Sequence, residues 1–296
     1  MQDSDTLHRF TFDDTPIRGN TVHLNQSYAI ALQHHAYPET LRIALGELMA
    51  AGMLLAATLK MHGALVLQIQ GKGPLKLLVV ECSRHAGRDD LTLRATAKYD
   101  DDFSGGSLQD MVGDGHFVIT LDPKDGSRGY QGVVPLEGDS ISSILENYMR
   151  RSEQIDTSIW LTCDGKSAGG LLLQKLPDQQ EADSDAWNRI NMLADTVQSQ
   201  ELLQLPTEAL LVRLFHEESV RLYEGQPIQF LCTCSRDNVR NMLRMMGREE
   251  IAGIIEERGE IEVHCDFCNQ RYRFDSVDAE QIFMPEVSMP GTNSRH

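Results

Sequence analysis

The sequence lacks an uncharged apolar run long enough to cross a membrane. Its longest such run covers 48–59, whereas a helix that spans a bilayer needs roughly 20 residues. The first five residues also lack the basic start and apolar stretch of a secretory signal, and two of them, Asp3 and Asp5, are acidic. We therefore expect neither export nor a membrane partner, and we expect a cytoplasmic location.

Positive charge is also scarce. The chain has 27 Lys and Arg against 44 Asp and Glu, which gives a net charge of −17. Proteins that bind nucleic acid normally cluster Lys and Arg against the phosphate backbone, and acidic residues outnumber basic ones in 232–296 as well. We expect no nucleic-acid partner. No Ser/His/Asp or carboxylate constellation stands out, so the sequence predicts no catalytic residues and no enzyme.

Cysteine is sparse except in one short segment. Six cysteines in a chain expected in a reducing compartment argue against a disulfide scaffold. Cys82 and Cys163 stand alone in apolar, strand-like surroundings, which is typical of small buried hydrophobic residues. The other four crowd into the last quarter of the chain: Cys232, Cys234, Cys265 and Cys268.

Mixed helical and strand patterns over 1–177 predict a layered α+β body. A helix over 38–60 is apolar almost all round and should lie buried between layers. A second helix, over 141–151, should be capped by Ser140 or Ser143, with Glu146 closing a capping box on Ser143. Strands are expected at 64–70, 75–83, 91–99, 116–121, 129–134, 158–163 and 170–176.

The composition changes at Pro177, and 178–231 is predicted to be a helical linker. An acidic, polar stretch over 178–185 leads into helices with apolar stripes. These helices have little capacity for a core of their own, so they must dock on a neighbouring domain or leave that surface exposed. The apolar residues that could bind another protein are Trp187, Ile190, Val197, Leu211, Leu214 and Phe215.

The last segment, 232–296, predicts a small domain of two helices and a β-hairpin. Ser235 can cap a helix that Gly247 ends, and a shorter helix should end at Gly259. Alternating residues over 260–264 and 270–274 predict two strands, with the second cysteine pair at the turn between them. The residues from 285 onward are predicted to form a mobile tail.

The two cysteine pairs of this segment, 30 residues apart, can converge on one tetrahedral zinc ion. With four thiolates available, His264 is expected to be a strand residue and not a ligand. The segment has few large apolar residues, so its folding free energy should come largely from one bound zinc per chain. Oxidation of the pairs would remove all four ligands together. A purely structural zinc site would use the same residues, and the ligands alone leave both possibilities open.

Two other classes of protein use similar cysteines. A thiol-disulfide oxidoreductase could use Cys265-Asp-Phe-Cys268, but that motif normally follows a strand and opens a helix, whereas here it interrupts a predicted hairpin. A zinc-ribbon adaptor that binds nucleic acid is disfavoured by the acidic balance of the segment.

The cysteine segment resembles a known family. Cys232-Thr-Cys234-Ser-Arg followed by His264-Cys265-Asp-Phe-Cys268 is similar to the C-terminal signature of the heat-shock chaperonin of about thirty-three kilodaltons, a bacterial redox-activated holdase. Segments of the body also look like N-terminal blocks of that family, namely 70–74, 130–134, 137–139 and 168–174. The resemblance covers nearly the whole chain.

The resemblance implies a specific mechanism. In this family the reduced, zinc-bound form is nearly inactive, and oxidation pairs the cysteines of each motif, releases zinc and loosens the linker helices. Carried over to this chain, the pairs would be Cys232 with Cys234 and Cys265 with Cys268. The oxidised protein would form a homodimer and hold unfolding client proteins without ATP, and the linker residues named above would be candidates for client binding.

Overall fold

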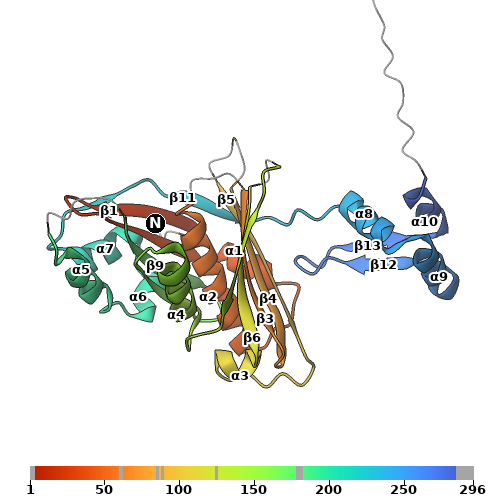
Figure 1. Cartoon of the computed structure of the whole chain (residues 1–296), viewed down its shortest axis with the longest axis horizontal. Helices are drawn as coiled ribbons and strands as arrows, with labels where there is room; N and C mark the ends of the chain where they lie inside the picture. Colours follow the sequence, from red (N-terminus) through yellow and green to blue (C-terminus); the bar gives the residue numbers. More distant parts are fainter. Residues whose placement is uncertain are drawn as a thin grey trace, which may run out of the picture. The chain divides into compact units, whose positions relative to one another are not determined.

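The structure is a computed structural model of the chain that describes residues 4–59, 63–84, 87, 90–123, 126–177 and 183–284. The chain divides into two compact units, Met1–Leu231 and Cys232–His296 (Figure 1). Three sequence predictions lie outside the described residues: the end of the first helix at Lys60, the start of the linker at 178–182, and the tail at 285–296.

The described part of the first unit is built on an eleven-stranded sheet in the order β7-β6-β3-β4-β5-β11-β1-β2-β9-β8, with β10 paired to β1. Neighbouring strands are antiparallel, except that β11 runs parallel to β5. The strands are β1 Thr6–Phe12, β2 Ile17–Leu24, β3 Gly63–Gly71, β4 Leu75–Arg84, β5 Leu91–Tyr99, β6 Gly115–Asp122, β7 Tyr130–Pro135, β8 Thr157–Cys163, β9 Ala168–Lys175, β10 Val220–Leu222 and β11 Gln226–Phe230.

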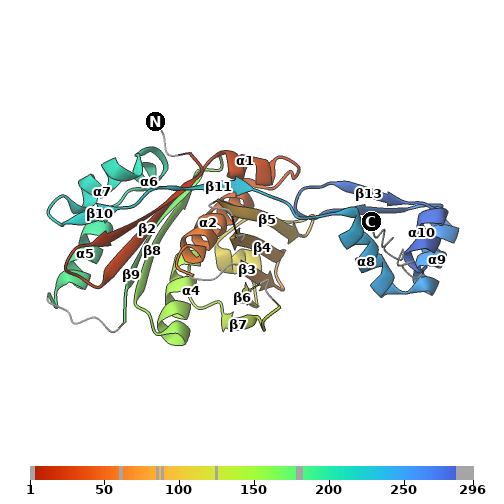
Figure 2. The same cartoon turned by 90° about the horizontal axis from the view of Figure 1, so that it is seen from above.

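The sheet curves around one central helix, α2 Glu39–Ala56, so that its two halves flank the helix (Figure 2). Leu, Ala and Met dominate this helix, and these residues combine high helix propensity with apolar surface. Twelve of its 18 residues are buried, which confirms the predicted burial between layers. The remaining helices of the body are α1 Gln26–Leu32, α3 Leu108–Val112 and α4 Ile141–Tyr148, which continues as the π-helical turn η1 Met149–Glu153.

The two isolated cysteines, Cys82 and Cys163, pack against glycines of α2. A Cβ on Gly46 would lie 2.5 Å from the Cys163 sulfur, and one on Gly52 would lie 2.9 Å from the Cys82 sulfur. The helix therefore packs its backbone directly against these two side chains. Burial raises the pKa of both thiols above the ordinary value for cysteine, which keeps them protonated and unreactive. Their role in the described structure is packing.

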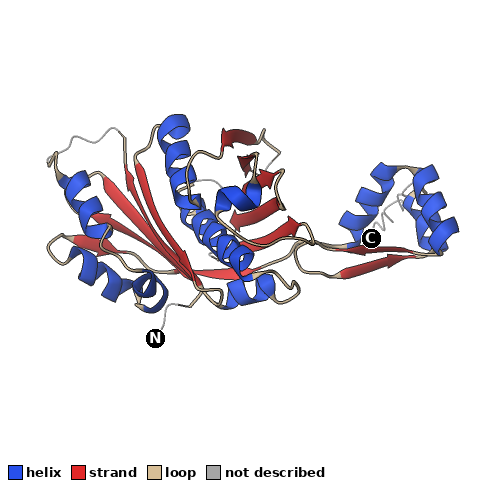
Figure 3. Ribbon diagram, turned by 90° about the horizontal axis from the view of Figure 1, so that it is seen from below, coloured by secondary structure: helices blue, strands red, loops and turns tan. Residues whose placement is uncertain are grey.

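Three helices follow the body in sequence and cover the other face of the β1-β2-β9-β8 half of the sheet: α5 Ala186–Ala194, α6 Ser199–Gln204 and α7 Thr207–Phe215 (Figure 3). They enclose a second core, separate from the one around α2, in which Phe10 and Phe12 of β1 meet Phe215 of α7. The helices predicted as a linker are therefore packed on the body in the first unit.

The structure corrects two local predictions. Ser140 caps α4, but its capping box is formed with Ser143, and the Glu146 carboxylate instead accepts a hydrogen bond of 2.7 Å from the Ile159 amide on β8. The prediction of a box between Ser143 and Glu146 was wrong because tertiary packing gives Glu146 a better donor. The second correction concerns β1, β2, β10 and β11, which the sequence patterns did not predict as strands.

Glu47 on α2 gives a pH-dependent prediction. Its carboxyl lines a cavity of about 220 Å³, and burial raises its pKa to about 7. Because this pKa exceeds that of the unfolded chain, the folded state holds the proton more tightly, and stability is lost as the pH rises from about 4.5 to 7. Glu47→Gln should therefore stabilise the first unit by about 1–2 kcal/mol at pH 8, after allowance for partial exposure, and should have little effect at pH 4.

Urea unfolding followed by tryptophan fluorescence measures this effect, because Trp160 and Trp187 both lie in the first unit. A matched control is Glu39→Gln at the exposed start of the same helix, which should not stabilise the first unit at pH 8. Equal stabilisation by Glu47→Gln at both pH values would contradict the assigned cause.

The second unit contains the two predicted helices, α8 Arg236–Met246 and α9 Arg248–Arg258, and the predicted hairpin, β12 Ile261–His264 and β13 Arg271–Phe274. Ser235 caps α8 by accepting a hydrogen bond from the Asn238 amide, and Gly259 ends α9 in the left-handed conformation. A third helix, α10 Ser276–Ile282, was not predicted. Together these elements enclose a small core.

Candidate metal centre

The first cysteine pair lies on the segment that enters α8. Ser235 turns the chain into the helix immediately after Cys234, and the Asn238 side chain donates a hydrogen bond of 3.1 Å to the Thr233 carbonyl between the two cysteines. The Ser235 cap and the Asn238 side chain therefore fix the backbone that carries Cys232 and Cys234. Both thiols are half-buried.

The second pair lies on the turn between β12 and β13. The Cys265 amide donates to the Gln270 carbonyl at 3.0 Å, and the Asn269 amide donates to the Cys265 carbonyl at 2.8 Å. Asn269 has φ +55°, in the left-handed region that asparagine tolerates better than most residues. The predicted turn with the second cysteine pair between two strands is present, and the pairing of β12 with β13 holds it.

The structure brings all four predicted cysteines together. Their sulfur atoms lie within 4.8 Å of one another, with Cys232 and Cys265 at 3.6 Å and Cys234 and Cys268 at 3.4 Å. A tetrahedral site with Zn–S bonds of about 2.3 Å places its sulfurs about 3.8 Å apart, whereas a disulfide bond is about 2.05 Å long. The cluster thus has the spacing of a four-thiolate metal site that can hold one ion.

The environment of the thiols is uneven. Burial opposes ionisation of Cys234, but hydrogen bonds outweigh it, first among them the one that the Tyr272 hydroxyl donates to its sulfur at 3.1 Å, and they lower its pKa. Burial raises the pKa of Cys232 and of Cys268. One thiol is therefore more readily ionised than these two neighbours, and a bound cation would favour the thiolate form of its ligands by charge attraction.

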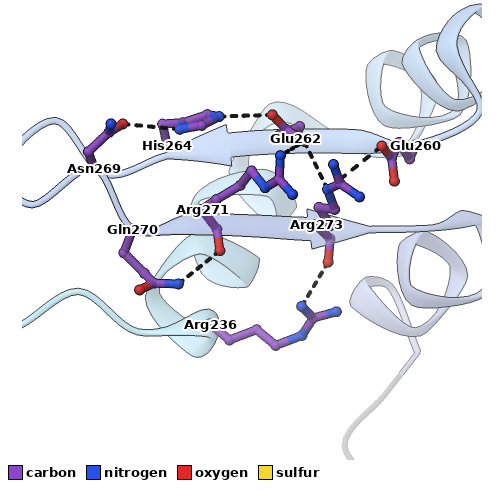
Figure 4. Close-up of polar contacts among 8 residues, drawn as sticks. All are labelled: Arg236, Glu260, Glu262, His264, Asn269, Gln270, Arg271 and Arg273. Atoms are coloured by element: carbon purple, nitrogen blue, oxygen red, sulfur yellow. Dashed lines mark hydrogen bonds and ion pairs between the residues drawn. The ribbon is translucent and has the colours of Figure 1, made fainter. Parts of the chain in front are cut away.

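His264 lies next to Cys265 but is not part of the sulfur cluster. Its ring nitrogens contact the Asn269 side chain at 3.1 Å and the Glu262 carboxylate at 2.9 Å (Figure 4). The same carboxylate accepts a hydrogen bond from Arg273, and Arg271 lies 3.5 Å away. His264 is thus a strand residue engaged in a polar network on the hairpin.

The core of the second unit is small. Its buried apolar residues are Leu243, Ile251, Ile261, Phe274, Ala279 and Ile282. Six buried side chains give little hydrophobic stabilisation for a unit of this length, and domains of this size usually need a metal or disulfides in addition. A soft, tetrahedral ion bound by the four sulfurs would supply the missing free energy.

The six candidate client-binding residues occupy the second core of the first unit. Ile190, Leu211, Leu214 and Phe215 are buried there, and Trp187 and Val197 are partly buried against it. The exposed large apolar residues of these helices are different ones, Met192 at 71% and Val212 at 62%. In the described conformation the predicted surface is therefore covered.

The Cys265–Cys268 motif connects two antiparallel strands and does not open a helix. The local structure that activates the cysteine pair of a thiol oxidoreductase, a helix N-terminus, is missing at this motif. One contact to the sulfur cluster was not predicted from the sequence, namely the hydrogen bond from Tyr272 to Cys234. Its signal was the alternation in 270–274, which places residue 272 on the same face of the strand as Phe274.

Comparison with known proteins agrees with this fold and site. The sequence model of a family described as "Hsp33 protein" matches residues 5–275. Curated relatives named "33 kDa chaperonin" include one from Methylobacillus flagellatus, 61% identical with full coverage of both chains, and one from Chromobacterium violaceum, 47% identical over 100% of this chain and 99% of the relative.

A crystal structure of the 33 kDa chaperonin from Thermotoga maritima has the same fold, with a TM-score of 0.79 at 22% identity over 94% of this chain and 97% of that one. The α+β body with its separate four-cysteine unit is thus the architecture of a chaperone and not of an enzyme family. The chain belongs to the Hsp33 family, which confirms the resemblance inferred from its motifs.

Proposed function

We propose that the chain is a redox-regulated, ATP-independent holdase that is inactive while its four cysteines hold one zinc ion. The observation that supports this most directly is the sulfur cluster in a unit with a small core. Cys232, Cys234, Cys265 and Cys268 would hold the ion, which supplies folding free energy and no catalytic chemistry.

Oxidation is the proposed trigger. In each motif two thiolates lose two electrons and form one disulfide, while a peroxide oxidant takes up those electrons and two protons and leaves as two water molecules. The proposed pairs are Cys232 with Cys234 and Cys265 with Cys268. A disulfide sulfur is a poor ligand for zinc, so the metal is released and the second unit loses its main source of stability.

The proposed client surface is the apolar side of α5 and α7. The second unit follows directly on β11 in the chain, and its unfolding would weaken the packing of the linker helices α5–α7 on the body. Separation of α7 from β1 would expose the aromatic cluster of Phe10, Phe12 and Phe215. An apolar surface of this kind binds unfolded chains, and the net charge of −17 would help to keep the complexes in solution.

Two further proposals follow from the family resemblance. The oxidised protein forms a homodimer, which would enlarge the surface available to an unfolding client. The protein works in the cytoplasm, because a reducing compartment keeps the four thiols available for zinc until an oxidant appears. Among the described residues, no helix is both long and apolar enough to span a bilayer.

The function is tested by measuring zinc content and client aggregation on the same sample. Reduced, zinc-loaded protein should bind about one zinc per chain and protect a thermally unfolding client poorly in light scattering. After peroxide treatment the zinc should appear in solution, and aggregation should be suppressed without ATP. Equal protection by the two forms would rule out redox control.

A further inference from the structure

The hairpin that carries the second cysteine pair has two chemically different faces. Cross-strand pairing places Glu262 opposite Arg273 and His264 opposite Arg271 on one face, where their side chains form the polar network of Figure 4. Alternation directs the intervening residues to the other face. There Ile261 pairs with Phe274 in the core, and Val263 pairs with Tyr272.

The charged network fixes which residue reaches the metal site. Arg273 donates to the Glu262 carboxylate at 2.9 Å, and Arg236 of α8 donates to the Arg273 carbonyl at 2.7 Å. These contacts tie the two strands to each other and to α8, the helix that follows the first cysteine pair. A one-residue slip of the register would turn Tyr272 to the opposite face.

In this register the Tyr272 hydroxyl lies 3.1 Å from the Cys234 sulfur and donates a hydrogen bond to it. The contact links β13, from the second half of the site, to a cysteine of the first half. A thiolate that binds a metal keeps lone pairs that can accept such a bond, and outer contacts of this kind tune metal ligands in many sites.

We infer that Tyr272 is a positioning residue that restrains the oxidation of Cys234. The inference rests on the proposed redox function. In the step concerned, the Cys234 thiolate attacks one peroxide oxygen, an S–O bond forms, the O–O bond breaks, and the departing hydroxide takes a proton to become water. Cys232 then attacks the Cys234 sulfur, forms the S–S bond and displaces the second hydroxide, which also becomes water.

The hydrogen bond slows the first attack because it holds the electron pair that must be donated to oxygen. A charge-assisted hydrogen bond changes the basicity of its acceptor by about tenfold to a hundredfold. Thiolate nucleophilicity follows basicity with an exponent of about 0.4–0.5. Loss of the Tyr272 hydroxyl should therefore accelerate oxidation of Cys234 by about threefold to tenfold.

The test uses the full-length, zinc-loaded protein and its Tyr272→Phe variant, which removes the hydroxyl and keeps the ring. Both are treated with hydrogen peroxide, and the oxidation of each cysteine is followed by differential alkylation and peptide mass spectrometry. Cys234 should react about threefold to tenfold faster in the variant, while Cys265 in the same molecule should change less than about twofold and serve as the internal reference. Tyr223→Phe, which removes a hydroxyl that contacts Thr11 in the first unit, is the matched control.

A second measurement separates this inference from the proposed function. Iodoacetamide alkylation of the zinc-loaded proteins reports the nucleophilicity of each sulfur without any oxidant, and Cys234 of Tyr272→Phe should again be selectively faster. If peroxide releases no zinc from the unsubstituted protein, the proposed redox function is contradicted. The alkylation rates would still show whether Tyr272 restrains Cys234. Unchanged Cys234 rates, or equal acceleration at all four cysteines through general loosening of the unit, would overturn the inference.

Discussion

Cys268→Ser is expected to abolish the proposed metal binding and to unfold the second unit, while the body up to about Pro177 remains folded. The serine hydroxyl is a poor zinc ligand, and apparent binding free energies of four-thiolate sites are about 10–16 kcal/mol. The six buried apolar side chains of the second unit cannot replace a loss of that order. Zinc retained against a micromolar chelator should fall from about one per chain to less than roughly a tenth.

Limited proteolysis of Cys268→Ser should cut within 232–284 and, as the α5–α7 helices loosen, within 183–231, and it should leave a resistant fragment that ends near Pro177. Tryptophan fluorescence should report the loosening of α5, which carries Trp187. Cys163→Ser is the matched control, because this thiol packs against α2 in the first unit and is not among the four clustered cysteines. Equal zinc loss in the two variants would refute the assignment of the ligands.

Phe215→Ala is expected to make the reduced, zinc-loaded protein active without an oxidant. The Phe215 ring is buried and contacts Phe12 edge-on, with ring centres 5.0 Å apart. Replacing a buried phenylalanine by alanine lowers the free energy of unfolding by about 3–5 kcal/mol. Here the lost contact is the one between α7 and β1. The helices should then separate from the sheet often enough to expose the proposed client surface.

Light scattering with a thermally unfolding client would show this as protection by the reduced variant that approaches the protection by the oxidised, unsubstituted protein. Val212→Ala on the same helix is the control, because its side chain is 62% exposed and the substitution should have little effect. If Phe215→Ala unfolds locally, as detected by proteolysis, and still gives no protection, the client surface lies elsewhere.

Local patterns predicted the elements whose sequence signal is local. The strand expected at 91–99 has the bounds found for β5, because β-branched and apolar residues alternate between clear turn signals. Ser235 and Gly247 marked the ends of α8, since a cap depends on neighbours within four residues. The four cysteines were also readable from sequence, because metal ligands come in closely spaced pairs.

Elements stabilised by distant partners escaped prediction. β2 is buried on both faces, between α2 and the second core, so Arg18, Asn20 and Thr21 conceal its strand character. β11 is a strand because its backbone pairs with β5 and β1. The sequence of its five residues alone does not indicate this pairing. By contrast, α10 had a readable signal in the capping box of Asp275 and Asp278, which the sequence analysis overlooked.

β11 connects the two halves of the sheet, because it lies between β5 and β1. It pairs with β5 through three residues and with β1 through two, and it joins the half of the sheet formed by β3–β7 to the half that α5–α7 cover. Cys232 follows it by two positions, so along the chain the strand adjoins the segment that we propose to unfold when zinc is lost. Withdrawal of β11 would open two strand edges at once, those of β1 and β5. The activated protein would then offer an extended client an unpaired backbone ladder for strand addition as well as apolar side chains.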